Sequence, residues 1–351
     1  MQKSYKEKFI LENIKVIVDA YGGDNAPEEV IKGANKALKN LENLNVIFVG
    51  KQDVIKKLCN ENKVDMSRVE IIDAQDVITN NESPTEAIKT KKESTLVKGF
   101  DRLKADDSVS ALVSAGSTGA VLTGGFIKIG RIKGISRPAL APTLPSLTGS
   151  PVLLIDCGAN VDCKPINLVH FALMGSKYME ALYGIKNPRV ALLSNGTEDH
   201  KGNDLNKRTF PYLKQLPINF VGNMEARDIL SGDYDVIVTD GFAGNVALKS
   251  TEGALMTLLK TLKSDIKSHK SSMFGALFMK GTFKRLKQKF DYSVYGGSPF
   301  LGINKIVIKA HGSSKEESFY QAIKQGYMVG KSKLVDVIAE SVKGLDIKIE
   351  E

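Results

Sequence analysis

The stretch VIVDAYGGDNAP, from Val16 to Pro27, shows the pattern that predicts the fold of this chain: a short apolar run, a loop of small and Asp/Asn residues, then a helix-like segment. The same pattern follows the apolar runs that end at Ser114, Asp156, Ser194 and Asp240. Continuous apolar runs of this length are typical of parallel strands covered by helices on both faces. In such sheets ligands bind beyond the carboxyl ends of the strands, where glycine turns and helix N-termini favour anions. The sequence therefore predicts an α/β enzyme that acts on a phosphate-like or carboxylate-like group.

The composition is that of an ordinary soluble protein, with 42% hydrophobic residues among 351. A formal net charge of +9 favours anionic partners such as phosphate, an acidic carrier protein or anionic lipid. Nucleic acid ranks last because no recognition motif is present. The three cysteines form no CxxC pair, which indicates reduced thiols in the cytoplasm. The charged N-terminus does not resemble a signal peptide, and no apolar stretch approaches the roughly 20 residues that span a bilayer.

The domain organisation predicted from the sequence is simple. Residues 1–13 form a charged N-terminal extension, and residues 14–345 form one elaborated α/β catalytic domain. Two lobes are an alternative, with a boundary near residues 137–150, where RPALAPTLP carries three prolines. Proline cannot donate to a central ladder, so this segment is either a sheet edge or a stiff connection.

Residues 264–295 break the strand–loop–helix rhythm and predict an amphipathic helical hairpin. Within them, the stretch 270–290 alternates large apolar side chains with lysine and arginine. That pattern fits an interfacial helix on an anionic membrane. The alternative is a hairpin packed on the body or on a second subunit, because phenylalanines at helical spacing usually belong to a core.

Two predictions concern individual helices. Ser83 followed by Glu86 predicts a capping box at the start of a helix. From about 315 to 343 the pattern predicts one long C-terminal helix.

The loop Ala115-Gly-Ser-Thr-Gly119 supplies the first candidate site. Ser117 and Thr118 place two hydroxyls beside the backbone N–H groups at a helix entry, and Gly119 follows them, which favours a phosphate cradle. A plain turn is one alternative. A serine nucleophile elbow is another, with His311 as its possible base.

Several cofactor motifs are missing from the sequence. The dinucleotide fingerprint GxGxxG is absent, and Gly125-Phe-Ile-Lys-Ile-Gly130-Arg131 lacks the Lys-Ser/Thr of a P-loop. The four histidines are scattered, without the spacing of a zinc site. We therefore expect neither a metal nor an organic cofactor.

Two further loops carry candidate catalytic groups. Lys201, in NGTEDHKGND, can neutralise phosphate or the oxyanion of a thioester under attack; its alternative is a solvated surface lysine. In DGFAGN, Asp240 and Gly241 allow close approach of a ligand, and Asn245 is expected to open a helix with an amide able to donate to a carbonyl oxygen. The alternative for this segment is a simple helix N-cap.

Seven stretches, in chain order, carry a resemblance to a known family. They are VDAYGGDNAPEEVIKGA at 18–34, SAGSTGAVL at 114–122, RPALAPTLPS at 137–146, LLIDCGANVDCKP at 153–165, NGTEDHKGND at 195–204, GNMEARDILSGDYDVIVTDGFAGNVALKSTEG at 222–253 and GGSPFLGI at 296–303. Together they resemble the bacterial phosphate acyltransferases of phospholipid synthesis (the PlsX family) over nearly the whole chain. The chain departs from that family's usual pattern at Tyr21 and Cys157.

The resemblance implies a homodimer with the three-layer α/β/α sandwich of isocitrate dehydrogenase, built on a mostly parallel central sheet. It implies transfer of a long-chain fatty acyl group from acyl carrier protein to inorganic phosphate, with no cofactor. Lys201 and Asn245 become the expected catalytic residues, and residues 270–290 the expected contact with the inner face of the membrane. The expected substrate- and phosphate-binding residues are Asp24, Ser117, Thr118, Gly119, Asn160, Asp240 and Gly241.

The mechanism expected from these assignments needs no activated side chain, because phosphate is already a nucleophile at neutral pH. Lys201 and the amides near Ser117 and Thr118 would hold phosphate, while Asn245 donates to the oxyanion. Two rival functions remain open: a phosphotransacetylase-like enzyme that uses coenzyme A, and a non-catalytic scaffold at the membrane surface. A serine hydrolase is the third.

Overall fold

The computed structural model describes residues 13–289 and 295–345, so most of the predicted extension 1–13 and part of the predicted hairpin lie outside the described residues. The first sheet has seven strands in the order β3-β2-β1-β4-β12-β11-β5. Their bounds are β1 Ile14–Asp19, β2 Leu44–Gly50, β3 Val69–Asp73, β4 Val109–Ser114, β5 Ala139–Leu140, β11 Ser298–Leu301 and β12 Ile306–Lys309. Strands β1 to β4 and β12 are parallel, and β11 is antiparallel to both of its neighbours.

The second sheet has five strands in the order β6-β7-β10-β8-β9. Their bounds are β6 Thr143–Leu144, β7 Val152–Ile155, β8 Arg189–Ser194, β9 Asn219–Glu225 and β10 Val236–Val238. All pairs are parallel except β6 with β7. The five apolar runs seen in the sequence are thus parallel strands, two of them in the first sheet and three in the second.

The chain passes from one sheet to the other through the proline-rich segment. β5 pairs with β11 of the first sheet, and β6, three residues further on, pairs with β7 of the second. Leu154 N also donates to Pro142 O at 3.0 Å, so the second sheet begins where the first one ends. The division of the chain into domains stays a prediction.

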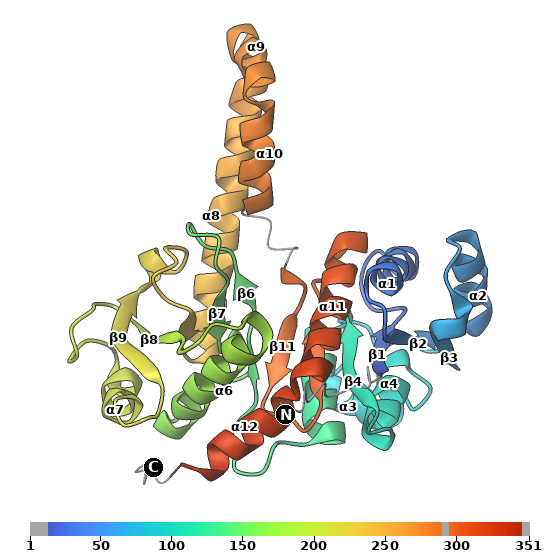
Figure 1. Ribbon diagram of the computed structural model, residues 1–351, viewed down its shortest axis with the longest axis horizontal. Coiled ribbons are helices and arrows are strands. Elements are labelled where there is room, and N and C mark those ends of the chain that lie inside the picture. The colour runs from blue at the N-terminus through green and yellow to red at the C-terminus, as the bar shows by residue number, and fades with distance from the viewer. Residues whose placement is uncertain (1–12, 290–294, 346–351) are drawn as a thin grey trace, which may run out of the picture.

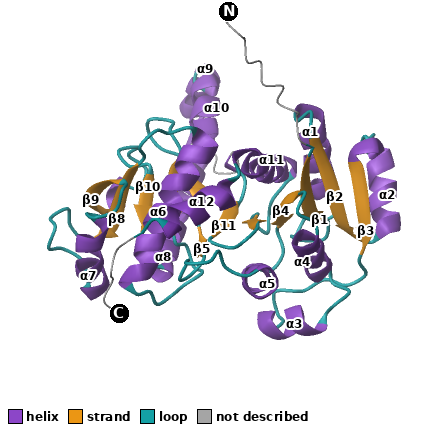
Figure 2. Cartoon of the chain, turned by 60° about the horizontal axis from the view of Figure 1, so that its bottom comes forward, coloured by secondary structure: helices purple, strands orange, loops and turns teal. Residues whose placement is uncertain are grey.

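Helices cover both faces of each sheet (Figures 1 and 2). Their bounds are α1 Glu28–Asn40, α2 Gln52–Glu61, α3 Pro84–Thr90, α4 Thr95–Ala105, α5 Thr118–Gly124, α6 Pro165–Tyr183, α7 Asp204–Leu213, α8 Gly241–Ser268, α9 Lys270–Phe278, α10 Lys280–Lys289, α11 Glu316–Ser332 and α12 Leu334–Lys343. On the first sheet, α1 and α11 lie on one face and α4 on the other; on the second, α6 and α8 lie on opposite faces.

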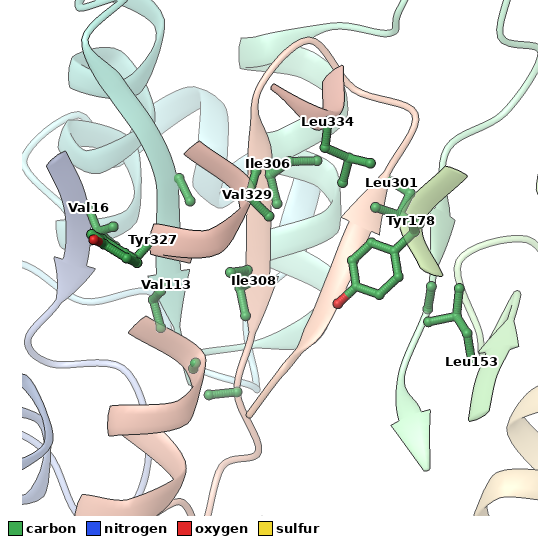
Figure 3. Packing of buried hydrophobic residues seen from close by; sticks show 14 of the residues in the cluster. Val16, Val113, Leu153, Tyr178, Leu301, Ile306, Ile308, Tyr327, Val329 and Leu334 are labelled. Carbon is green, nitrogen blue, oxygen red and sulfur yellow. The ribbon is translucent and has the colours of Figure 1, made fainter. Parts of the chain in front are cut away.

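The core explains why the strands read as continuous apolar runs. Val16 and Val18 of β1 belong to the apolar cluster beneath α1 and α11, while Ile17 between them belongs to the cluster beneath α4. Because successive side chains of a strand point to opposite faces, a strand buried on both sides needs an apolar residue at every position. Figure 3 shows Val16 and Val113 from two adjacent strands beneath Tyr327 of α11.

The projecting helices correspond to the hairpin expected from the sequence. Figure 1 shows α8 leaving the body as one long helix, with α9 at its far end. The first arm is thus the second half of α8 itself, since this helix runs unbroken from Gly241 to Ser268. Among the helices of the described residues, none combines the length and the apolar character that crossing a bilayer requires.

Two local helix predictions were wrong. The expected single helix from 315 to 343 is divided at Lys333, whose φ of 50° lies in the left-handed region, into α11 and α12. The expected capping box at α3 does not form: Ser83 is the N-cap residue, but its side chain makes no capping hydrogen bond. Glu82 instead accepts from Thr79 N at 2.7 Å and pairs with Lys91 at 2.8 Å, which organises the turn before the helix.

Candidate functional site

Three loops meet at the carboxyl edge of the first sheet, because β1, β4 and β12 are neighbours in it. They are the GGDN loop at 22–25, the AGST loop at 115–118 and the HGSS loop at 311–314. Asp24 N donates to Gly312 O at 2.8 Å, and the Asn25 amide donates to the backbone carbonyls of residues 313 and 314, each at 3.2 Å. Hydrogen bonds from the first loop to backbone carbonyls of the third loop therefore hold the two loops together.

Asp19 holds the AGST loop in place through Ser114. Ser114 Oγ donates to Asp19 Oδ2 at 2.7 Å, and Gly116 N donates to Ser114 Oγ at 3.0 Å. Burial raises the pKa of the Asp19 carboxyl, while these hydrogen bonds oppose the shift. A Cβ at Gly22 would lie 2.7 Å from both Asp19 Oδ2 and Gly116 N, so only glycine permits this approach of the two loops.

Asp156 plays the matching role at the edge of the second sheet. Its Oδ1 accepts from Leu140 N at 2.8 Å and Ala159 N at 3.2 Å, and its Oδ2 accepts from the backbone N and the side-chain amide of Asn160 at 2.7 and 2.9 Å. The carboxyl is fully buried, and burial raises its pKa to about 6. Asp156 therefore ties β5 and the loop after β7 into one unit.

That unit also seats the start of α8. Asp240 caps the helix by accepting from Ala243 N at 2.8 Å, and Gly241 N donates to Asn160 O at 2.8 Å. A Cβ at Gly244 would collide with the backbone carbonyl of Asp156. The expectation that Asn245 opens the helix was wrong, because α8 begins four residues earlier; Asn245 lies in its second turn and is exposed.

Two cavities of about 500 and 190 Å³ meet between the two sheets. The larger is bounded by the loops of the first sheet, including Asp24 and Ser117. The smaller is bounded by Asn245, Cys157 and Glu252. Four residues line both cavities, and these are Thr118, Lys249, Lys309 and His311. We define this place as the junction.

Lys309, like Lys249 of α8, is a junction residue that sequence reasoning missed. It ends β12, directly beside Ser114 of β4, and its ammonium donates to Ala115 O at 3.4 Å and to Ala310 O. Burial lowers the pKa of this ammonium to about 8. The available signal was a lysine closing an otherwise apolar run, IVIK, immediately before a glycine loop.

The structure brings part of the predicted site together at the junction. Asp24, Ser117, Thr118 and Asn245 line the two cavities. The side chain of Asn245 lies beside Gly158, with 3.7 Å between Asn245 Cγ and the position of a Gly158 Cβ. Within the described residues its amide has no hydrogen-bond partner, so it can donate to a ligand.

Other predicted residues lie behind or beside the cavities. Asn160 is buried and donates to Pro138 O at 2.7 Å, so its amide is used within the protein. Gly241 packs against the backbone of Asn160, and Gly119 lies against Pro84 of α3, where a Cβ would approach Pro84 Cγ to 2.7 Å. The geometry gives these glycines packing contacts rather than positions on a cavity wall.

The loop that carries Lys201 lies on the other side of α8. A groove of about 920 Å³ runs along the face of α8 that carries Ala243 and Ala247, opposite the face that carries Asn245. Asp240 lines this groove, as do Gly202 and Asn203, which directly follow Lys201. In the part of the chain that the structure describes, Lys201 is not among the residues lining the two cavities of the junction.

The thiols and hydroxyls at and near the junction are poorly placed to act as nucleophiles. Burial raises the pKa of the Cys157 thiol well above its usual range and that of Cys163 to about 12, so both stay protonated at neutral pH. Ser117 and His311 line the same cavity, but His311 Nδ1 lies 2.8 Å from Ser313 Oγ and no bond joins it to Ser117 in the described chain. This arrangement favours an enzyme whose nucleophile arrives with a substrate.

Across residues 13–289 and 295–345, no three His, Cys, Asp or Glu side chains come together as ligands of one ion.

Known proteins match this chain over most of its length. A family model described as "fatty acid synthesis protein" matches residues 14–336. The phosphate acyltransferase of Clostridium acetobutylicum is 46% identical over 331 residues, which are 94% of this chain and 99% of that protein. The phosphate acyltransferase of Caldanaerobacter subterraneus is 47% identical over 312 residues, 89% of this chain and 92% of its own.

Solved structures show the same architecture. A phosphotransacetylase from Streptococcus pyogenes superimposes with a TM-score of 0.62 at 17% identity, covering 92% of this chain and 94% of its own. The EutD phosphotransacetylase of Staphylococcus aureus gives 0.60 at 18% identity, covering 91% and 94%. At these identities the likeness shows the fold alone, and it confirms the α/β fold predicted from the sequence.

Proposed function

The chain belongs to the family of fatty acid synthesis proteins that includes the bacterial phosphate acyltransferases, and on this premise we propose that its acyl donor is the thioester of a long-chain acyl-acyl carrier protein. The chain is an acyltransferase, and its family chemistry is transfer of an acyl group to phosphate. The acyl phosphate would then serve phospholipid synthesis.

One observation supports the junction as the place of this transfer. It combines an exposed amide, Asn245, with two cationic side chains, Lys249 and Lys309, at the meeting point of two cavities. A tetrahedral intermediate needs a donor aimed at its oxyanion, and a phosphate dianion needs cations. Separate cavities let the two substrates approach each other from different sides.

The reaction follows from those groups. An oxygen of hydrogen phosphate attacks the thioester carbonyl carbon, and the negative charge moves to the carbonyl oxygen, to which Asn245 donates. The intermediate collapses by breaking the carbon–sulfur bond, and the phosphate proton passes to the departing thiolate. The products are acyl phosphate and the free thiol of the carrier. Because phosphate is the nucleophile, no side chain needs to be acylated.

Lys201 remains a proposed catalytic residue with a different position. Its loop adjoins the groove on the far face of α8, so any contact with substrate would come from that side. Replacement by alanine should depress turnover strongly if Lys201 touches the reacting groups. Unchanged turnover would remove it from the site.

The carrier protein is proposed as a partner on electrostatic grounds. With a formal net charge of +9, the chain attracts an acidic protein, and such attraction weakens as salt screens it. We expect kcat/KM for palmitoyl-acyl carrier protein to fall with rising ionic strength. A rate indifferent to salt would count against carrier docking by charge.

The projecting helices support two further proposals, a cytoplasmic enzyme that contacts the anionic inner membrane face through residues 270–290 and a homodimer. At the tip, Phe274 and Phe278 are 65% and 80% exposed, while lysines stand nearby on α10. Apolar side chains beside basic ones favour an anionic lipid surface.

Exposed apolar residues on α8 such as Phe242 and Leu258 suit a second copy of the chain. Vesicle co-sedimentation and light scattering test the two proposals separately.

A comparison of donors tests the proposed function. Purified protein is supplied with palmitoyl-acyl carrier protein, palmitoyl-coenzyme A or acetyl-coenzyme A at equal concentration, and kcat/KM is measured for each in the presence of phosphate. The proposal requires the carrier-bound donor to have the highest value. A preference for acetyl-coenzyme A would favour the phosphotransacetylase-like alternative, and lipid binding without any turnover would favour the scaffold.

A further inference from the structure

We infer that Lys309 and Lys249, brought together from β12 and α8, form the binding site for inorganic phosphate, and that Glu252 is the counter-ion that phosphate displaces. The inference rests on the proposed function in that it names the nucleophile's site. It is tested by phosphate binding alone, so its failure can be told apart from failure of the acyl transfer.

Lys309 provides the fixed part of the site. Its ammonium is held by the carbonyls of Ala115 and Ala310, which use two of its three N–H donors. Since Lys309 lines both cavities of the junction, the remaining donor has room to reach a ligand there. The site is therefore built into the sheet edge.

Lys249 provides the adjustable part. It follows Asn245 by four residues on α8, so the two side chains share one face of the helix. It lines both cavities, as Lys309 does, although its side chain is 55% exposed. Burial is the main cause of the lowered pKa of Lys309, the charges of Asp19 and Asp24 oppose the shift, and the positive charge of Lys249 adds to it, so the two ammonium groups repel each other. An anion between them relieves this repulsion, and a dianion does so best.

Glu252 holds Lys249 in the absence of an anion. Its Oε2 lies 2.8 Å from Lys249 Nζ, one helical turn further along α8, and it lines the smaller cavity. An exposed pair of this kind is weak. Phosphate can therefore replace the carboxylate as the partner of Lys249.

This placement also explains how phosphate would meet the thioester. Asn245, the proposed oxyanion donor, lines the same small cavity as both lysines. A phosphate held by Lys249 and Lys309 lies beside the carbonyl that Asn245 polarises. The loop of Lys201 adjoins the groove on the opposite face of α8 through Gly202 and Asn203, and among the described residues Lys201 lines neither cavity of the junction.

The test is calorimetric titration of the full chain with inorganic phosphate, with no acyl donor present. Lys309→Met and Lys249→Met should each weaken binding by about tenfold or more, the loss of a charge-assisted hydrogen bond. Glu252→Gln should tighten it by about two- to fivefold, because the competing carboxylate is gone. Lys260→Met, at an exposed lysine of the same helix, is the matched control and should bind as the parent does.

Two outcomes would overturn the inference: phosphate affinity unchanged in Lys249→Met, or affinity lost in Lys201→Met but kept in both junction variants. Lys309→Arg retains the charge and should retain binding, which separates loss of charge from loss of fold; thermal unfolding of each variant gives a second check. A chain that binds phosphate through these lysines yet transfers no acyl group would leave the phosphate site standing and refute the proposed function instead.

Discussion

Replacing Asp156 by asparagine changes the buried carboxyl that ties β5, the loop after β7 and the start of α8 together. Its two oxygens accept four hydrogen bonds, two each, from Leu140, Ala159 and Asn160. Asparagine keeps one accepting oxygen and replaces the other by an NH₂ group, which cannot accept from the two N–H donors that point at it. Two buried N–H groups therefore lose their partner.

The magnitude can be worked out from this geometry. Each unpaired buried donor costs about 1–3 kcal/mol, so the missing acceptor should cost the variant about 2–6 kcal/mol of unfolding free energy. The pKa of Asp156 rises from 3.8 to about 6 on folding, so the folded state binds the proton more tightly. As pH rises through that range, the wild-type chain therefore loses about 3 kcal/mol of stability at this site, at about 1.4 kcal/mol per pKa unit.

Asparagine does not titrate, so the variant lacks that loss. The destabilisation by Asp156→Asn, measured against wild type, should shrink by about 2–3 kcal/mol between about pH 4 and about pH 7. Urea unfolding curves at both pH values give the difference. Asp162→Asn, at an exposed position of the same loop, is the matched control and should show no such change. A difference that stays constant or grows with pH would refute the reasoning about the buried charge.

Three further predictions concern the junction and its support. Asn245→Ala should lower turnover by about 10²–10³ with an unchanged unfolding midpoint, since the exposed side chain stabilises only the reaction. Phosphate affinity should decline as pH rises through about 8, where Lys309 loses its proton, and Lys309→Arg should extend binding to higher pH in the same titration. Gly244→Ala should reduce stability and turnover together because its Cβ meets the Asp156 carbonyl, whereas Gly253→Ala on the same helix meets open space and should stabilise by about 0.5–1 kcal/mol in thermal unfolding.

The sheet strands could be predicted because a strand that is buried on both faces needs apolar residues at nearly every position. In Val109–Ser114, Ala111 and Val113 belong to one apolar cluster and Val109 and Leu112 to the other, so the apolar run can be recognised from the sequence alone. The break between α11 and α12 at Lys333 could not be recognised from the sequence, because a lysine with left-handed backbone angles has the same side chain as a lysine on a helix surface. Sequence pattern reports burial well and single backbone angles poorly.

The candidate site was only partly predictable for a topological reason. The Asp24 and Ser117 loops were found because each follows an apolar run directly. Lys309 was missed because its importance comes from β12 lying beside β4, a pairing between segments almost two hundred residues apart along the chain. Lys201 and Asn245 belong to similar-looking sequence segments, yet Asn245 lies on α8 while the loop of Lys201 adjoins the groove along the other face of that helix. Loop composition carries no information on which face of a helix a loop adjoins.

The most direct test of the central claim is a single-turnover reaction of the full chain with radiolabelled palmitoyl-acyl carrier protein, with and without inorganic phosphate, trapped with hydroxylamine. Because hydroxylamine also cleaves the thioester directly, hydroxamate is counted above an enzyme-free reaction. Transfer to phosphate at the junction predicts such an excess only when phosphate is present, and its loss in Asn245→Ala. Hydroxamate formed equally without phosphate, or an intact donor in both reactions, would contradict that account.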